Sequence, residues 1–237
     1  IIYLVFDKQP DNIQKVYEKD DENIKSQKYI MNALFRENGQ RNHINQGILN
    51  ANVEDIIMIS DVDEIPNIDN INFSEIDEKI ILFKQDMFYY KFNLSIPEFK
   101  WTGTKACKFK NFISPQWLRN IKDRKYPFYR LDTLFSKKKY IDVKIVNDGG
   151  WHFSNIKTAK EIEYKLKSYL HHREFDLESL SVKQIEETIK NKKAIYDLNV
   201  DKNINKVGTG SKLEKFDLKK LPLYIQDNLN LYKSWID

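Results

Sequence analysis

The stretch from Ile56 to Pro66, IIMISDVDEIP, constrains the fold more than any other part of the 237-residue chain. Its first four residues, Ile56 to Ile59, are apolar, mostly β-branched and not interrupted by polar ones, which indicates a strand within 53–60 that is covered on both faces, as in a parallel sheet. Pro66 has no backbone N–H to donate to a ladder, so we expect the strand to end near Asp61 and a loop to follow.

This loop carries the carboxylates Asp61, Asp63 and Glu64 immediately after the buried strand. In open α/β sheets, ligands bind beyond the carboxyl ends of the strands, and two carboxylates at positions i and i+2 of a tight loop can meet one divalent cation. Mg²⁺ or Mn²⁺ in such a site keeps coordination positions open for phosphate oxygens. The loop therefore predicts a cation that bridges a diphosphate, with a solvated acidic loop as the alternative.

Two other interpretations of the acidic loop begin from the same residues. A calcium-binding loop fits poorly, because it has Ile65 at its fifth position, Pro66 where a glycine makes the turn, and Asn72 where a bidentate glutamate is required. A phosphatase of the haloacid dehalogenase type would use Asp61 as its nucleophile. That signal would require Thr or Val at Ile65 and a second acidic pair on a later strand, and the sequence has no convincing pair.

The second informative stretch is Gly149 to Ser154, GGWHFS. A glycine pair lets the backbone approach a ligand closely, and the following His152 is then available as a partner for a metal or a phosphate. A packed or surface histidine is the plain alternative.

Composition excludes several classes of protein. The formal charge is +4, from 39 basic and 35 acidic residues, so only a weak preference for polyanions follows and no nucleic-acid partner is expected. The single cysteine, Cys107, excludes an intramolecular disulfide and a CxxC zinc site. No apolar run approaches the roughly 20 residues of a membrane span, so we expect a soluble, cytoplasmic protein.

Hydrophobic periodicity predicts one α/β domain with a helical C-terminal extension. The expected strands are 1–6, 80–83, 87–92 and 141–146, in addition to the one before the acidic loop. Helices are expected from Ile24 to a stop at Gly39, from a Ser114 N-cap, from Ile162 through Tyr169 and Leu170, over 179–196, and over 218–235. Because the chain opens without Met inside an apparent strand, we expect it to be a fragment.

With SDVDEIP and GGWHFS together, the chain resembles glycosyltransferase family 17, the family of the bisecting β-1,4-N-acetylglucosaminyltransferases of N-glycans. The resemblance extends from about Tyr3 to Tyr196. It includes Phe35-Arg36-Glu37 with Arg41-Asn42, the aromatic segment 88–93, Trp101-Thr102-Gly103 with Arg119, and the series Ile162, Lys165, Ser168, His171 and Glu174.

The resemblance implies a GT-A-like (Rossmann-like) fold with a mixed sheet, a bound Mn²⁺ or Mg²⁺, and inverting transfer from a UDP-sugar, N-acetylglucosamine above all, to a glycan acceptor. On this basis Asp63 is expected to bind the metal directly, Asp61 to contact the metal or the donor ribose, and His152 to complete the metal or diphosphate site. Arg41 and Lys165 are expected to face the donor phosphates.

The resemblance also suggests where the sugars lie. Trp151 is expected to contact the donor, and Trp101 and Tyr90 the acceptor, because aromatic rings stack on sugar faces. Inversion needs a general base for the acceptor hydroxyl. The sequence does not identify this base: Glu64, Asp132, Asp148 and Glu174 are the available carboxylates. Asp132 and Glu64 are taken as the catalytic candidates, although Glu64 beside Pro66 is also suited to fixing the loop.

Members of the family usually begin with an additional strand and helix ahead of the equivalent of Ile1, so we expect part of the nucleotide pocket to be absent from this chain. The nucleotide-sugar and metal core is expected over 1–160 and a helical part over 161–237. Richness in Ile, Asn and Lys suggests a microbial or viral member, with an acceptor in a surface polysaccharide or a lipid-linked glycan. Two alternatives are a DxD phosphohydrolase and a noncatalytic glycan-binding module.

Overall fold

The computed structural model describes residues 1–69, 71–168, 180–195 and 210–237, which group into two compact units. One unit comprises Ile1–Gly47 with Lys157–Leu213, and the other comprises Ile48–Ile156 with Glu214–Asp237. The second unit contains the sheet and the acidic loop. A single domain with a boundary near residue 160 stays a prediction.

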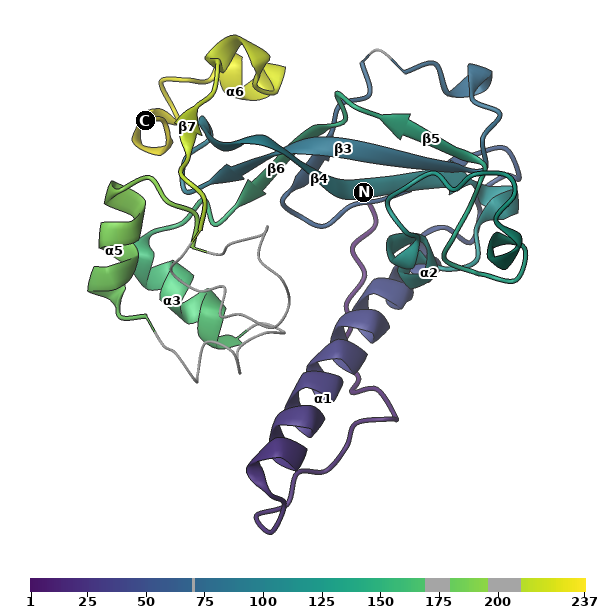
Figure 1. Ribbon diagram of the computed structural model, residues 1–237, viewed down its shortest axis with the longest axis horizontal. Helices are drawn as coiled ribbons and strands as arrows, with labels where there is room; N and C mark the ends of the chain where they lie inside the picture. The colour runs from purple at the N-terminus through teal and green to yellow at the C-terminus, as the bar shows by residue number, and fades with distance from the viewer. Residues whose placement is uncertain (70, 169–179, 196–209) are drawn as a thin grey trace. The chain divides into compact units, whose positions relative to one another are not determined.

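The sheet of the second unit has seven strands among the described residues, in the order β1-β4-β3-β6-β2, with β5 beside β3 and β7 beside β4 (Figure 1). The strand β3 is parallel to β5 and β6, and every other pairing is antiparallel. The predicted α/β fold with a mixed sheet, which contains both parallel and antiparallel pairs, is therefore confirmed. The bounds are β1 Ile56–Ile59, β2 Glu64–Pro66, β3 Ile80–Tyr89, β4 Leu94–Lys108, β5 Val143–Val146, β6 Gly150–Ser154 and β7 Glu214–Lys215.

Two expectations about the strands are wrong. The strand β1 pairs with β4 in antiparallel orientation, whereas its apolar run suggested a parallel neighbour. The two segments predicted over 80–92 form the single strand β3, whose ladder with β4 continues through two register shifts. The predicted end of the first strand near Asp61 is confirmed, because β1 ends at Ile59 and a turn follows. Pro66 lies in the next strand, β2, at the edge of the sheet, where a missing N–H leaves no inner ladder bond unmade.

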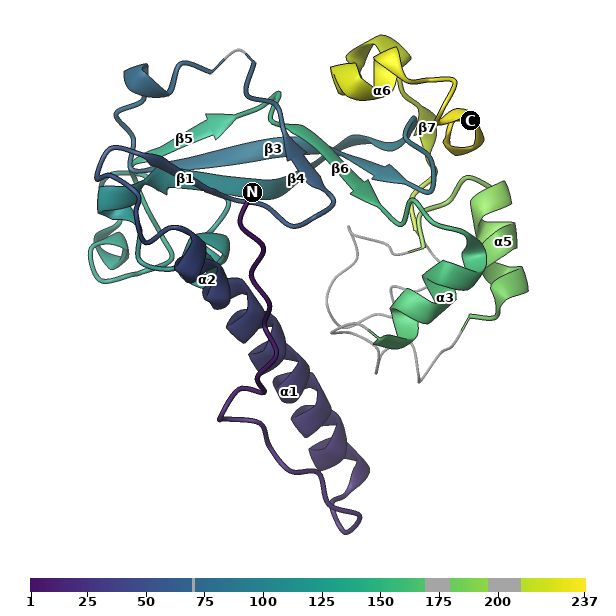
Figure 2. The ribbon, with the colours of Figure 1, turned by 180° about the vertical axis from the view of Figure 1, so that it is seen from behind.

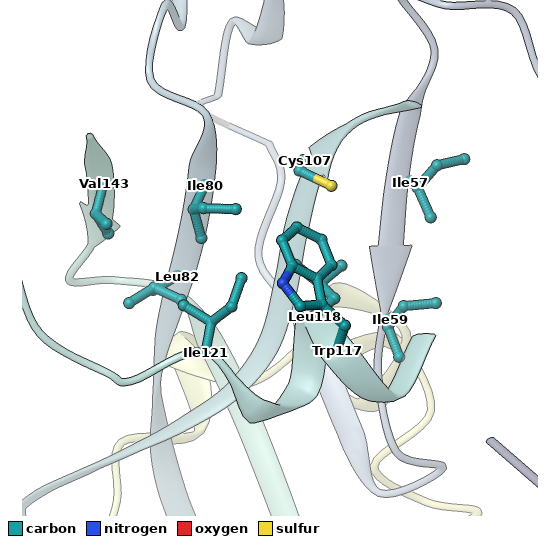
Figure 3. Packing of buried hydrophobic residues seen from close by; sticks show 9 residues of the cluster. All are labelled: Ile57, Ile59, Ile80, Leu82, Cys107, Trp117, Leu118, Ile121 and Val143. Atoms are coloured by element: carbon teal, nitrogen blue, oxygen red, sulfur yellow. The ribbon is translucent and has the colours of Figure 1, made fainter. Parts of the chain in front are cut away.

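Hydrophobic clusters cover both faces of the sheet around β1. On one face, Trp117 and Leu118 of the helix α2, Pro115–Asn120, pack against side chains of β1, β3 and β4 (Figure 3). A smaller cluster around Ile81 and Phe83 lies on the other face. The predicted coverage of both faces of β1 is thus confirmed, although the neighbouring strand is antiparallel.

The helix α2 begins as the sequence predicts. The Ser114 hydroxyl accepts a hydrogen bond from the backbone N–H of Trp117 at 3.2 Å, and Pro115 occupies the first turn. This short helix matters for the site because its last turn carries Arg119.

The first unit contains the helices α1, Glu22–His43, α3, Ala159–Ser168, and α5, Val182–Lys190. The predicted helix over 24–39 is confirmed, but it continues past Gly39, where an added Cβ would lie 2.8 Å from the Phe6 ring, so Gly39 serves packing and does not end the helix. The predicted buried strand at 1–6 is wrong: these residues pair with no described strand, and Ile1, Ile2 and Tyr3 are exposed. Tyr169, Leu170, His171 and Glu174 lie outside the described residues.

The C-terminal segment is broken into short turns instead of the predicted single helix over 218–235. Pro222 follows a 3₁₀ turn and precedes the helix α6, Leu223–Asp227, because proline cannot continue a preceding helix. The described 3₁₀ helices are Ile44–Gly47, Phe73–Glu75, Phe109–Asn111, Leu131–Thr133, Leu218–Lys220 and Lys233–Trp235. None of the described helices combines the length and the apolar character that a bilayer span requires.

Candidate active site

The acidic loop is a tight turn between β1 and β2. The backbone N–H of Glu64 donates to the carbonyl of Asp61 at 3.0 Å, and the backbone N–H of Asp61 donates to Oε2 of Glu64 at the same distance. The turn reverses the chain, so that β2 pairs with β6 and Glu64 lies opposite His152. The pairing is extended by the backbone N–H of Phe153, which donates to the carbonyl of Asp63 at 2.8 Å.

This pairing brings the Asp63 carboxylate and the His152 imidazole together. Nε2 of His152 lies 3.4 Å from Oδ1 of Asp63, and the two side chains are 10% and 29% exposed. The other ring nitrogen, Nδ1, is buried without a hydrogen-bond partner. Trp101 on β4 packs against the imidazole, with ring centroids 5.3 Å apart. A buried, partly unsatisfied imidazole beside a reachable carboxylate is the arrangement from which a ligand site can be built.

Glu64 is buried and fully engaged by its neighbours. Arg119 donates from Nη1 to Oε2 at 2.8 Å and from Nη2 to Oε1 at 2.9 Å, and the Trp101 indole N–H donates to Oε1 at 3.0 Å. Nη2 of Arg119 also donates to Oδ2 of Asp61 at 2.8 Å. One guanidinium thus fixes two of the three carboxylates of the loop, and a bidentate Arg–carboxylate pair is the geometry best suited to such fixing.

Opposing effects set the pKa values of the basic groups around Glu64. Burial by itself lowers the pKa of the Arg119 guanidinium, but the hydrogen bond to Glu64 and the charges of Glu64 and Asp61 outweigh burial and raise it. Burial lowers the pKa of the nearby Lys105 ammonium to about 8, although its Nζ donates to the backbone carbonyls of Arg119 and Ile121. Three carboxylates against the Arg119 guanidinium and the Lys105 ammonium still leave a net negative charge, which favours a cation.

Glycines permit the close packing that this site requires. A Cβ on Gly103 would collide with the side chain of Gln85 and would lie 2.8 Å from the carboxyl carbon of Glu64. Gly150 has φ +113°, in the region that favours glycine, and a Cβ there would collide with the carbonyl of Ile65 on β2. Within GGWHFS, Gly150 to Ser154 form the strand β6, and Gly150 lets β2 lie close to it, whereas a Cβ on Gly149 would collide with the β3 backbone at Phe83 and Lys84.

Two side chains of this site are placed as ligands for a divalent cation. Among the described residues, no group of three or more His, Cys, Asp or Glu side chains is arranged to hold a metal ion. Asp63 and His152 supply two groups, which fits a cation such as Mg²⁺ or Mn²⁺ that takes its other ligands from substrate phosphates and water. Asp61, the other predicted ligand, is directed to Arg119.

The three aromatic residues that we expect to contact sugars do not lie together in one site. Trp101 belongs to the site, as described above. Trp151 alternates with His152 along β6 and lies on the opposite face, where it packs with the cluster around Phe88 and its indole N–H donates to the carbonyl of Lys220 at 2.8 Å. There it lines a cavity of about 580 Å³. Tyr90 is only 1% exposed, so its ring offers little surface to a sugar.

The remaining predicted residues lie away from the acidic loop or in the other unit. Asp132 is on a 3₁₀ turn, where hydrogen bonds from Arg130 and Lys139 hold its pKa well below its usual range. Arg41 on α1 pairs with Glu37 at 3.0 Å, and Lys165 is on α3. Both helices belong to the first unit, so the phosphate roles of Arg41 and Lys165 stay predictions.

Two site residues received no role from the sequence. In the sequence Arg119 is only part of the family pattern, and an isolated arginine in a short helix gives no sign of its partners. Gln85, whose buried Oε1 lacks a hydrogen-bond partner and whose Nε2 donates to Thr104 at 3.3 Å, has no signal in the sequence at all.

The fold and the site together define a mixed α/β protein with a carboxylate–imidazole pair at the edge of its sheet. Residues 3–236 match the model of glycosyltransferase family 17, and the chain belongs to this family. It is therefore a glycosyltransferase. Searches of curated proteins and of solved structures found no match.

Proposed function

We propose that this chain is an inverting, metal-dependent glycosyltransferase of the GT-A type, which moves N-acetylglucosamine from UDP-GlcNAc to a glycan acceptor. The observation that carries the proposal is the meeting of Asp63 and His152, which are 89 positions apart in the sequence and are brought together by the β2–β6 pairing. The family match supports transfer over phosphate-ester hydrolysis and over noncatalytic glycan binding.

In this proposal Asp63 and His152 hold the cation, and Arg119 and Glu64 keep the loop in shape. A bound Mn²⁺ or Mg²⁺ would neutralise the charge that develops on the departing UDP. Glu64 acts as a positioning residue, because its two carboxylate oxygens already accept hydrogen bonds from Arg119 and Trp101.

Asp132 remains the proposed general base on the acceptor side. Its ion pairs with Arg130 and Lys139, at 2.7 and 2.6 Å, make its carboxylate a weak base. Proton uptake from an acceptor hydroxyl therefore requires that one of these cations move away as the acceptor binds.

The proposal is tested by isothermal titration calorimetry of UDP-GlcNAc with the chain, in Mn²⁺ and in a chelator. We expect binding in Mn²⁺ that the chelator removes and that Asp63→Asn and His152→Gln each weaken more than about tenfold, since each removes one of the two proposed ligands. Asp77→Asn, an exposed carboxylate of the same unit, and His43→Gln, on α1, are the matched controls.

Two outcomes would contradict the proposal. Oligosaccharide binding that ignores both the chelator and Asp63→Asn, with no affinity for UDP, would indicate a noncatalytic glycan-binding module. Hydrolysis of phosphate esters that Asp61→Asn abolishes, again with no affinity for UDP, would indicate a phosphohydrolase with Asp61 as its nucleophile.

A further inference from the structure

The loop between α2 and β5 exposes an unusual run of apolar side chains. Five large apolar residues within the eight positions 128–135 are between 68% and 90% exposed, namely Phe128, Tyr129, Leu131, Leu134 and Phe135. Single exposed apolar residues are ordinary on protein surfaces, whereas a contiguous group marks an interaction site. The proposed function uses none of these five side chains, and the one residue of this segment that it does use is Asp132, the proposed general base.

The exposed apolar side chains belong to a folded loop that has buried residues of its own. At its base, the backbone N–H of Lys122 donates to the carbonyl of Lys138 at 2.7 Å, and the loop lies beside α2 at the β5 end of the sheet (Figures 1 and 2). Tyr126 and Thr133 are buried inside it, and the Thr133 hydroxyl donates to the carbonyl of Arg130 at 2.6 Å. The apolar side chains thus lie outside a loop that is already closed.

The excess of positive over negative charge in this protein lies in the same segment. Residues 122–140 contain seven basic and two acidic residues, a net charge of +5, while the other 32 basic and 33 acidic residues of the chain give −1. The basic residues flank the apolar run on both sides, as Lys122, Arg124 and Lys125 before it and Lys137, Lys138 and Lys139 after it.

We propose that residues 122–140 form a membrane-docking loop that places Phe128, Leu134 and Phe135 among the headgroups of an anionic lipid surface. Aromatic and leucine side chains partition into the interface between headgroups and acyl chains, and flanking lysines are attracted to anionic lipids. A nucleic acid would be bound by the charges, but it would leave the exposed leucines in water. The charge asymmetry favours an anionic partner, and the apolar tip favours lipid.

The loop gives the protein a peripheral attachment that is independent of donor binding, so it goes beyond the proposed function. A transferase held in this way would meet acceptors that are themselves anchored in a membrane. The acidic loop need not be functional for the attachment to operate.

The test is co-sedimentation of the full chain with vesicles of phosphatidylcholine alone or of phosphatidylcholine mixed with phosphatidylglycerol. We expect binding to the anionic vesicles that weakens with added salt. The triple variant Phe128→Ser/Leu134→Ser/Phe135→Ser and the double variant Lys137→Glu/Lys138→Glu should each lower the partition coefficient more than about tenfold.

Matched variants elsewhere separate this effect from general loss of hydrophobicity or charge. Leu49→Ser/Leu231→Ser changes equally exposed leucines, and Lys183→Glu/Lys190→Glu reverses two exposed lysines of α5, so both should bind vesicles like the wild type. All substituted side chains are exposed, and circular dichroism checks that each variant is folded.

Several results would overturn the proposal. They are equal binding to neutral and anionic vesicles, equal losses in the control variants, absence of vesicle binding, and a basic loop that binds nucleic acid in preference to lipid. Because none of these measurements uses a sugar donor, a failure here is distinguishable from a failure of the proposed transferase activity.

Discussion

The guanidinium of Arg119 donates hydrogen bonds to both carboxylate oxygens of Glu64, and the two side chains are 11% and 1% exposed. Glu64 begins β2 and Arg119 lies in the last turn of α2, so this pair joins the acidic loop to the helix that packs on the sheet. The loop geometry that presents Asp63 to His152 therefore depends on a contact with a helix more than fifty positions away.

Replacing Arg119 should destabilise the protein strongly. Arg119→Gln leaves the buried Glu64 carboxylate without its cation, and the free energy of unfolding should fall by about 3–5 kcal/mol. Arg119→Lys should recover only part of this loss, because an ammonium cannot make the bidentate contact. Urea unfolding measures both. Lys110→Gln, which breaks an exposed pair with Glu54, should cost less than about 1 kcal/mol; equal losses in both variants would refute the structural role of Arg119.

Gly103→Ala should displace Glu64 from its position. The added methyl group collides with Gln85 and the Glu64 carboxyl group, and overpacking of this kind costs about 1–3 kcal/mol. We expect a lower midpoint of urea unfolding together with weaker nucleotide binding in calorimetry. Gly47→Ala is the control, because its added methyl group meets only the end of the Leu4 side chain, at 3.3 Å. Normal nucleotide binding by Gly103→Ala would show that Glu64 does not position the loop.

Lys105 should make stability rise with pH in the alkaline range. Its pKa is lowered by burial to about 8 in the folded protein, from an ordinary value of 10.5, so between these values the unfolded chain binds more protons than the folded one. The free energy of unfolding should then gain about 2 kcal/mol from this group between pH 8 and pH 10. Comparing wild type with Lys105→Met at both pH values isolates the effect; a difference that is the same at both would refute it.

Cys107 should be inert in the folded protein. It lies on β4 within the core beside α2 (Figure 3), and burial raises the pKa of its thiol to about 12. Almost none of it is thiolate at pH 8, and the thiolate is the reactive form. Labelling with a chromogenic disulfide should therefore be slow in buffer and fast in urea. Rapid labelling of the native protein would mean that this side of the core opens readily.

Local patterns in the sequence predicted several elements correctly because the signals are themselves local. Ser114-Pro115 marks the start of α2 through a capping hydroxyl and a fixed φ angle. The run from Ile56 to Ile59 identified β1 and the coverage of its two faces. The strand at 1–6 failed for the opposite reason, since apolar residues form a strand only when a partner strand is present.

The sequence by itself determined the family, the chemical character of the acidic loop and the presence of an imidazole within GGWHFS, because these are properties of residue type and spacing. Only the tertiary structure decided that Asp63 meets His152, that Arg119 fixes Asp61 and Glu64, and that Trp151 lies on the other face of β6. Strand register and the packing of α2 make these contacts, and both depend on pairings between distant segments that no local pattern encodes.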